Sequence, residues 1–243
     1  MTNIIKAEFL KQKRTMSSKL IFVFPMITLV MAFVLTSGMT NAYAESVWNW
    51  WYVLLLPGMI AIVSYLSIMR EKKNGYYNIK TLSIEKRTLM LGKIAYLGIL
   101  VLVSNAVLFV GAALGGAFLT TSVPVIGAAM TVVVLTITEL WQIPLFLFLS
   151  EKFGMVVELI VCLFITVLGI IVAPSGKWFL FVSSVSMRIV TPLLHVLPNG
   201  LRAQTGDPLL NASVIFPGIL IALAWFVLLT YLYLNWFEKR EVK

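Results

Sequence analysis

The chain has 243 residues, of which 60% are hydrophobic and only 12% are charged, and it carries a formal net charge of +9. Because soluble domains contain roughly a quarter charged residues, this composition excludes an ordinary soluble protein and indicates one compact membrane domain, residues 1–243. The single cysteine, Cys162, lies in an apolar run, which excludes an intramolecular disulfide and a thiolate metal site. The basic residues flank apolar runs, so they indicate an anionic membrane surface and no nucleic-acid partner.

Residues 1–19 predict an amphipathic cytosolic helix. Ile5 and Phe9 can share one helical flank, while Lys13 and Arg14 belong to the basic residues that cover much of the rest. Such a pattern is typical of a helix that lies in the membrane interface with its apolar side in the headgroup boundary. A plain lead-in that only anchors the first span is the alternative.

Six apolar runs have about the length of 20 residues that crosses a hydrocarbon core of about 30 Å. The first is followed by Ala42-Tyr43-Ala44, which imitates a signal-peptidase site. Glu8 within a long basic region favours a first span that is retained. The predicted spans are residues 20–38, 51–69, 94–119, 125–149, 155–172 and 216–237.

The basic residues predict the orientation of these spans. Sixteen of the nineteen Lys and Arg residues fall in the N-terminal segment, between spans two and three, between spans four and five, and after span six. Only Lys177, Arg188 and Arg202 fall on the other side. Since cytoplasmic segments are enriched in Lys and Arg, both termini are predicted to lie in the cytoplasm.

The predicted cytosolic loop 70–93 contains seven of the basic residues. A solvated loop that orients the protein is the simplest interpretation. Asn74-Gly75 is a turn signal, however, and aromatic and apolar residues then recur among the charges, which favours a short amphipathic helix that docks a partner protein. The candidate docking residues are Glu71, Lys72, Lys73, Asn74, Gly75, Tyr76 and Tyr77.

Acidic residues inside the spans are the candidates for a transport path. Glu139 lies about 18 Å from the cytosolic end of span four, and an acid near mid-membrane costs on the order of 2.5–3.5 kcal/mol. Trp141 and Gln142 beside it, and Glu158 one turn into span five, complete the candidate path. A hydrogen-bonded packing role for Glu139, and a position at the cytosolic interface for Glu158, are the alternatives.

The segment 173–213 is too apolar for a solvated loop. Pro192, Pro198 and Asn199-Gly200 break it into pieces that are too short to span, so it predicts re-entrant helices that dip into the outer leaflet. They either line a transport route or cap the bundle.

Sequence motifs for catalysis are missing. The chain contains no GxxxxGK[ST], HExxH or GxSxG pattern, and its lone histidine, His195, has no second imidazole or thiolate to join it. We therefore expect a non-catalytic membrane subunit without a metal site. Energy for any uphill transport would come from another subunit or from an ion gradient.

Three motifs accompany the six spans: EFLKQKR at 8–14, EKKNGYY at 71–77 and Pro198-Asn199-Gly200-Leu201. With these spans and motifs, the chain resembles the permease subunits of type-2 ABC exporters. Among these, the chain is most similar to the lantibiotic-immunity permeases of Gram-positive bacteria. The resemblance implies an all-α membrane protein with an N-terminal interfacial helix, a coupling helix within 70–87 and re-entrant outer helices in 173–213.

The resemblance also implies partners and a substrate. Two copies of an ATP-binding subunit would bind ATP and Mg, a second permease would be related or identical, and this chain would hold no cofactor. The substrate would be a cationic lantibiotic expelled from the cell membrane. One alternative is an ABC permease for a lipid or another drug. Another is a proton- or ion-coupled carrier in which Glu139 and Glu158 titrate. A membrane-embedded enzyme is disfavoured, because the chain lacks the clustered polar residues that such an enzyme would need.

Overall fold

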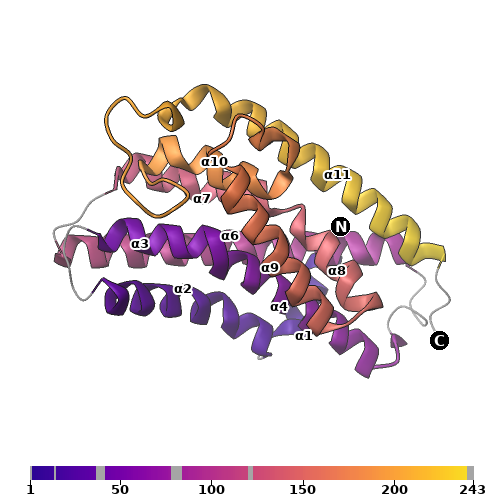
Figure 1. Cartoon of the computed structure of the whole chain (residues 1–243). Coiled ribbons are helices and arrows are strands. Elements are labelled where there is room, and N and C mark those ends of the chain that lie inside the picture. Colours follow the sequence, from indigo (N-terminus) through magenta and orange to yellow (C-terminus); the bar gives the residue numbers. More distant parts are fainter. Residues whose placement is uncertain (1, 14, 37–41, 78–83, 120–122, 240–243) are drawn as a thin grey trace.

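A computed structural model describes residues 2–13, 15–36, 42–77, 84–119 and 123–239, and the regular structure in these ranges is helical, with a single isolated β-bridge between Val196 and Arg202. The long helices run side by side in an elongated bundle (Figure 1). The α-helices are α1 (Thr2–Gln12), α2 (Met16–Leu35), α3 (Tyr43–Trp50), α4 (Leu56–Lys73), α6 (Lys86–Leu119), α7 (Val125–Glu139), α8 (Gln142–Lys152), α9 (Met155–Val172), α10 (Val182–Leu194) and α11 (Ile215–Lys239).

Five segments are long and apolar enough to cross a membrane, and a bent pair of helices makes a sixth candidate. The five are α2, Tyr43–Lys73, α6, α9 and Ala212–Lys239; the segment Tyr43–Lys73 joins α3 to α4 through a π-helical turn, η1 (Trp51–Leu55). They correspond to the predicted spans, but several helices extend further than predicted. Several of the predicted spans stop next to charged residues, because charges indicate the membrane surface. Some of these charged residues are paired inside the bundle, so the helices continue past them.

The bent pair is α7 and α8, which meet at an angle of 43°. Pro144 explains the break, because it lacks the N–H that would bond the carbonyl of Leu140, four residues earlier. That carbonyl instead accepts a hydrogen bond from the backbone N–H of Ile143 at 3.1 Å. The bend places Glu139 at the last position of α7 and Gln142 at the first position of α8.

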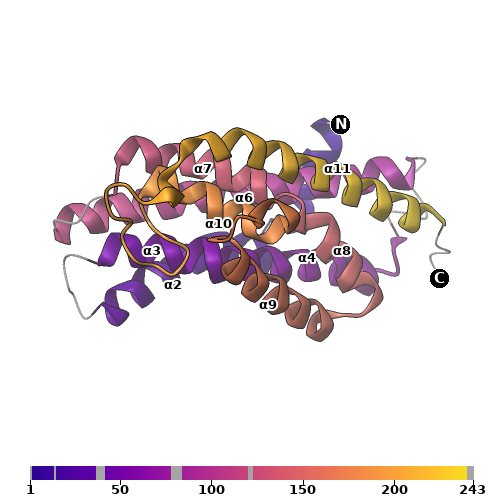
Figure 2. The ribbon, with the colours of Figure 1, turned by 45° about the horizontal axis from the view of Figure 1, so that its top comes forward.

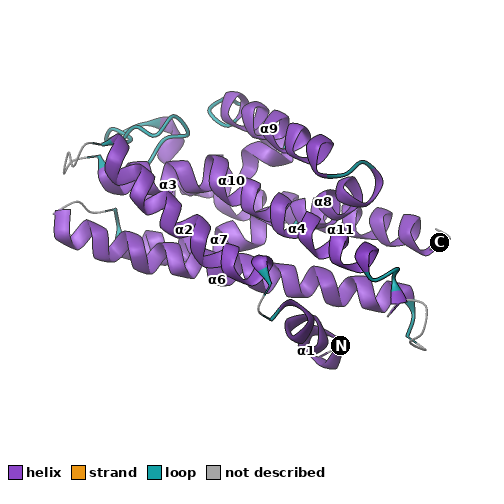
Figure 3. Ribbon diagram, turned by 90° about the horizontal axis from the view of Figure 1, so that it is seen from below, coloured by secondary structure: helices purple, strands orange, loops and turns teal. Residues whose placement is uncertain are grey.

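The segment Tyr43–Lys73 lies at the centre of the bundle, with 61% of its most apolar stretch buried, whereas the corresponding share for Ala212–Lys239 is 11%. Figure 2 shows α11 and α9 on opposite outer sides of the bundle, and Figure 3 shows α9 at its edge. We call the end where α4 ends and α6 begins the charged end, and the opposite end, which carries residues 195–214, the loop end. Both described chain termini lie toward the charged end (Figure 2).

The segment 173–213 contains one α-helix, α10, and two short 3₁₀ turns, η2 (Trp178–Leu180) and η3 (Pro208–Leu210), with a third, η4 (Ala212–Val214), at its end. The predicted break at Pro192 was wrong, because α10 continues through this proline to Leu194 and ends at His195, whose φ is 58°. Nearly all of α10 is buried among α7, α9 and α11.

Close approach of α10 depends on glycines in the surrounding helices. A Cβ atom at Gly127 of α7 would lie 1.9 Å from the Leu193 carbonyl oxygen, and one at Gly169 of α9 would lie 2.7 Å from the Ser183 oxygen. Any larger residue at either position would therefore displace the backbone of α10. This short helix is an internal element of the bundle and not a surface flap.

Candidate functional site

Four charged residues from three helices form a compact group at the charged end, which we call the ion-pair cluster: Glu8 and Lys11 of α1, Glu71 of α4 and Lys93 of α6. Each of the two carboxylates contacts each of the two ammonium groups. Two acidic and two basic residues give the cluster no net formal charge. It ties the N-terminal helix to the two helices that flank the predicted docking loop.

Lys93 is the centre of the ion-pair cluster. Its side chain is 1% exposed, and Nζ lies 3.2 Å from Glu71, 3.4 Å from Glu8 and 3.1 Å from the Ser67 hydroxyl. These three acceptors match the three N–H donors of an ammonium group. Because a buried charge without partners is very unfavourable, the position of Lys93 fixes α1, α4 and α6 relative to one another.

Lys11 closes the cluster nearer the surface. Its Nζ lies 2.6 Å from Glu8 and 3.2 Å from Glu71. Burial by itself lowers the pKa of Lys11, but the hydrogen bonds and negative charges of Glu8 and Glu71 outweigh it, so the pKa is raised above 10.5. Lys11 therefore stays charged throughout the physiological pH range.

The N-terminal helix packs differently from the sequence prediction. Its buried residues are the polar Glu8 and Gln12, whereas Phe9 and Leu10 are 41% and 64% exposed. Phe9 makes an edge-on contact with Tyr96. The helix thus attaches to the bundle through the buried polar groups together with Ile4, which packs against α6, while Leu10 is left exposed.

Among the other residues predicted for this helix, Ile5 is half-buried and Lys13 is exposed. Arg14 lies outside the described residues.

The chain leaves α4 through a turn in the left-handed conformation. Gly75 has a φ of 56° and Tyr76 a φ of 54°, and the N–H of Tyr76 donates to the carbonyl of Glu71 at 2.9 Å. This resembles a glycine-type helix cap, which satisfies carbonyl groups at the helix end. For a tyrosine, such a conformation costs energy and requires support from its surroundings.

Glu151 at the end of α8 supplies that support. The Tyr76 hydroxyl donates a hydrogen bond to the Glu151 carboxylate, and Lys72 Nζ donates to the Glu151 backbone carbonyl at 2.9 Å. The turn is thus held by α8 on one side, while Glu71, just before it, is held by α1 and α6 on the other.

These contacts divide the seven predicted docking residues. Glu71 and Tyr76 are buried inside the chain and Lys72 is partly buried, so they do not form an outward surface. The exposed members, which we call the docking turn, are Lys73, Asn74, Gly75 and Tyr77. The rest of the predicted coupling helix falls largely on residues 78–83, outside the described residues. Both ends of the predicted loop 70–93 are helical, since α4 continues to Lys73 and α6 begins at Lys86.

Sequence reasoning missed Lys11, Lys93 and Glu151 as members of this site. One signal for them was present: Glu8 and Glu71 are isolated acids within strongly basic segments. An acid in such a position has many basic partners within reach. The sequence does not say which partner is buried with it.

The predicted transport-path residues lie elsewhere, in the interior. Glu139 accepts hydrogen bonds from Gln142 and from Ser186 of α10, and Trp141 is also buried. Buried polar atoms that lack a partner here are Trp141 Nε1 and Gln142 Oε1. Glu139 and Gln142 meet at the bend between α7 and α8, which the sequence predicted as one continuous span, and their role in a transport path stays a prediction.

Glu158 is fully buried in the chain and does not reach the surface of the bundle. Its carboxylate accepts a hydrogen bond from the Ser150 hydroxyl at 2.6 Å, which links α9 to α8. Cys162 lies within electrostatic reach of both Glu139 and Glu158. The two acids therefore belong to the same interior region.

Among the described residues, no group of three His, Cys, Asp or Glu side chains could hold a metal ion. Comparison with known proteins gives no identity for the chain, since no protein-family model and no curated protein sequence matches it. Functional inference therefore rests on the residues and their geometry.

Proposed function

We propose that this chain is the permease subunit of an ABC transporter that expels a cationic lantibiotic from the cell membrane of a Gram-positive bacterium. Two ATP-binding subunits would bind ATP and Mg and dock at the docking turn. A second permease, related or identical, would complete the membrane part, and both termini would lie in the cytoplasm.

The observation that carries this proposal is the support beneath the docking turn. Lys73, Asn74, Gly75 and Tyr77 are exposed, while Glu71 and Tyr76, in the same segment, are anchored to α1, α6 and α8. A loop that served only to orient the protein would not need buried ion pairs and a strained tyrosine. Such an arrangement suits a surface that receives force.

The same contacts suggest how movement would spread. Closure of the ATP-binding subunits would push the docking turn, and the ion-pair cluster would carry that displacement to α1, α4 and α6 as a unit. Because α4 continues the central segment of the bundle, its tilt would alter the packing of the α8 and α9 helices that it contacts. An opening toward the membrane or the outer side would then release the peptide.

A second candidate function rests on the interior acids. Glu139, Gln142 and Ser186 form a buried polar group at the bend between α7 and α8, where a carboxyl group that gains and loses a proton could drive a carrier. That carrier would work without any ATPase. It would lose transport on Glu139→Gln, a change that keeps the shape of the side chain.

The proposal is tested by expressing the tagged chain with its neighbouring genes and measuring lantibiotic resistance and co-purifying proteins. Replacing Asn74 and Tyr77 with alanine should abolish resistance and the bound ATPase while the chain stays folded in the membrane, because both side chains are exposed. Lys177→Ala, at an exposed residue of the predicted outer segment, is the control. Full resistance in the Asn74/Tyr77 variant would refute the docking assignment.

A further inference from the structure

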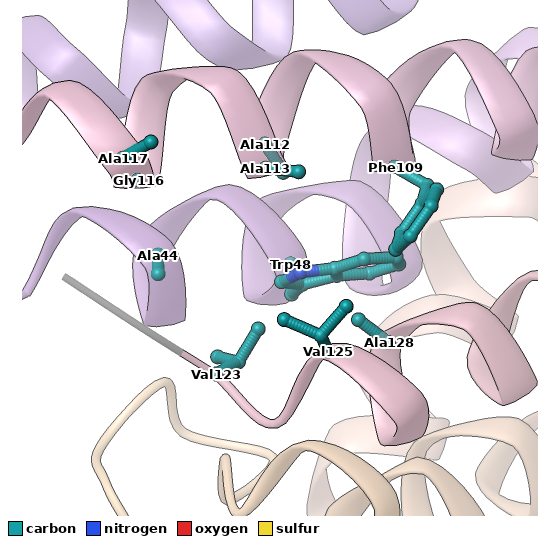
Figure 4. Close-up of a pocket in the computed structure, with 10 residues that line it drawn as sticks. All are labelled: Ala44, Trp48, Phe109, Ala112, Ala113, Gly116, Ala117, Val123, Val125 and Ala128. Carbon is teal, nitrogen blue, oxygen red and sulfur yellow. The ribbon is translucent and has the colours of Figure 1, made fainter.

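A slot of about 210 Å³ lies between α3, α6 and the start of α7, near the loop end. Figure 4 shows Ala112, Gly116 and Ala117 of α6 along one wall and Trp48 of α3 across the slot. All the lining residues are alanine, glycine, valine, phenylalanine or tryptophan. The only nitrogen or oxygen on any of these side chains is Nε1 of Trp48.

The slot opens onto an apolar outer surface. Ala112 and Gly116 at its floor are buried, but Ala113 and Ala117 at its rim are exposed. Beside the rim, Phe118 is 88% exposed, as expected for a helix surface that faces lipid. A molecule could therefore enter sideways from the bilayer.

Trp48 marks the slot as a ligand site. The residue is 0% exposed, yet its indole N–H has no hydrogen-bond partner. A buried donor left unpaired costs about 1–3 kcal/mol, so nearly all such groups are satisfied in folded proteins. Figure 4 shows the indole nitrogen on the side of the slot where Ala44 and Val123 lie. An occupant should bring a hydrogen-bond acceptor to this point and apolar groups elsewhere.

The depth of Trp48 indicates which acceptor. Helix α6 has 34 residues and is about 51 Å long, so a centred α6 extends about 10 Å beyond each face of a hydrocarbon core of about 30 Å. Ala112, beside Trp48, lies seven residues, or about 10 Å, from the end of α6 at Leu119. The indole N–H is thus at the boundary between headgroups and acyl chains, where the ester carbonyls of phospholipids lie and where tryptophan is enriched.

We propose that the slot binds one acyl chain of a bilayer phospholipid, whose ester carbonyl accepts a hydrogen bond from Trp48. The chain would then run from the level of Ala112 toward Phe109, three residues or about 5 Å deeper along α6. This inference does not rest on the transport function proposed above. A bound chain would fill the space between α3, α6 and α7 and stabilise their packing.

The experiment uses the purified full-length chain in nanodiscs with a phosphatidylglycerol that carries a photoactivatable diazirine in one acyl chain. After illumination, mass spectrometry should find adducts concentrated on the peptides of α6 and α7 that line the slot. An unlabelled ester-linked phosphatidylglycerol should displace this probe about five-fold better than its ether-linked analogue, which has no carbonyl to accept the hydrogen bond. Trp48→Phe should remove that difference.

Ala113→Leu provides a second, independent test, because it fills the slot from its exposed rim. Adducts at the slot should fall at least about five-fold, as the space is lost, while Ala224→Leu, an equal change on the exposed face of α11, should leave them unaltered. Equal competition by the ester and ether lipids, or unchanged labelling in Ala113→Leu, would overturn the proposal. Displacement of the probe by a lantibiotic but not by unlabelled lipid would assign the slot to the peptide, and would also overturn it.

Discussion

The two ends of the bundle are held together by different chemistry. At the charged end, Lys93 is buried among two carboxylates and a hydroxyl, so the contacts there are ionic and shielded from water. At the loop end, residues 195–203 attach to α3 and η1 through neutral hydrogen bonds, in which Asn49 of α3 donates to the carbonyl of Pro198 at 3.1 Å and Tyr52 of η1 to that of Leu197 at 3.2 Å.

The one ion pair described at the loop end is long and is open to water only on its arginine side, because the Glu45 side chain is 8% exposed. Arg202 lies 4.0 Å from Glu45, and its side chain is 70% exposed. Neutral and exposed contacts can be exchanged for water at little cost, whereas a buried ion pair cannot. This contrast suggests that the charged end moves as a rigid unit and that rearrangement is easier at the loop end.

The largest effect should come from Lys93→Met, which leaves Glu8 and Glu71 buried with a reduced set of partners. We expect unfolding in detergent to become easier by about 3–5 kcal/mol, the usual cost of breaking a buried pair. Thermal unfolding followed by circular dichroism measures this. The control is Lys13→Met, which removes an exposed lysine close to the end of α1 that is not part of the ion-pair cluster. It should change stability little. A similar loss in both variants would show that the cluster does not fix the charged end.

Tyr76→Phe should have the next largest effect. It removes the hydroxyl that bonds the Glu151 carboxylate and leaves that buried group with one donor fewer, for an expected loss of about 1–3 kcal/mol. Tyr77→Phe is the matched control, because the Tyr77 side chain is 65% exposed. Limited proteolysis within residues 74–85 should also become faster in Tyr76→Phe only. Equal rates in the two variants would argue against an anchored turn.

Gly75→Ala tests the conformation of the turn separately from its contacts. A Cβ atom there would meet nothing within 4 Å, but the φ of 56° disfavours alanine, so a loss of about 1 kcal/mol is expected. Gly176→Ala is an informative comparison, since its Cβ also meets open space and its φ is not in the left-handed range. Its stability should be unchanged or slightly higher. Equal destabilisation in both variants would contradict the assigned backbone conformation.

The smallest effect belongs to the loop end. Arg202→Ala should cost about 1 kcal/mol or less, because the pair is long and Arg202 is 70% exposed, although the change leaves the buried Glu45 carboxylate with one partner fewer. Asn49→Ala should cost about 1 kcal/mol through the lost hydrogen bonds to the loop. Paired unfolding curves of the two variants measure the difference. A loss in either variant as large as that in Lys93→Met would reverse the comparison between the two ends.

The positions of the apolar spans could be predicted from the sequence, because an apolar run of about 20 residues has few structural alternatives: five of the six predicted spans match candidate spans, and the sixth corresponds to the bent pair α7 and α8. Span five illustrates this, since the predicted 155–172 coincides with α9. The course of α10 through Pro192 could not be predicted, as it depends on Gly127 and Gly169 in distant helices that make room for it. Tertiary packing overrode the local signal of the proline.

The candidate site shows the same division. The turn at Asn74-Gly75 was predicted from local turn chemistry, and the φ of Gly75 confirms it. The inward direction of Tyr76 was not predicted, because it depends on Glu151, seventy-five residues further along the chain. Likewise, the burial of Lys93 depends on Glu8 and Glu71, and charge alone indicated a solvated residue.

The most direct test of the proposed function is site-specific crosslinking from the docking turn. Asn74→Cys adds an exposed thiol to a chain whose only cysteine, Cys162, is buried, so a thiol crosslinker should react at position 74 alone. In cells that express the neighbouring genes, we predict a crosslinked product containing a protein with a GxxxxGK[ST] motif, and none from Lys19→Cys. No such product in cells that contain the ATPase, or resistance to the lantibiotic in a strain that lacks it, would contradict the account.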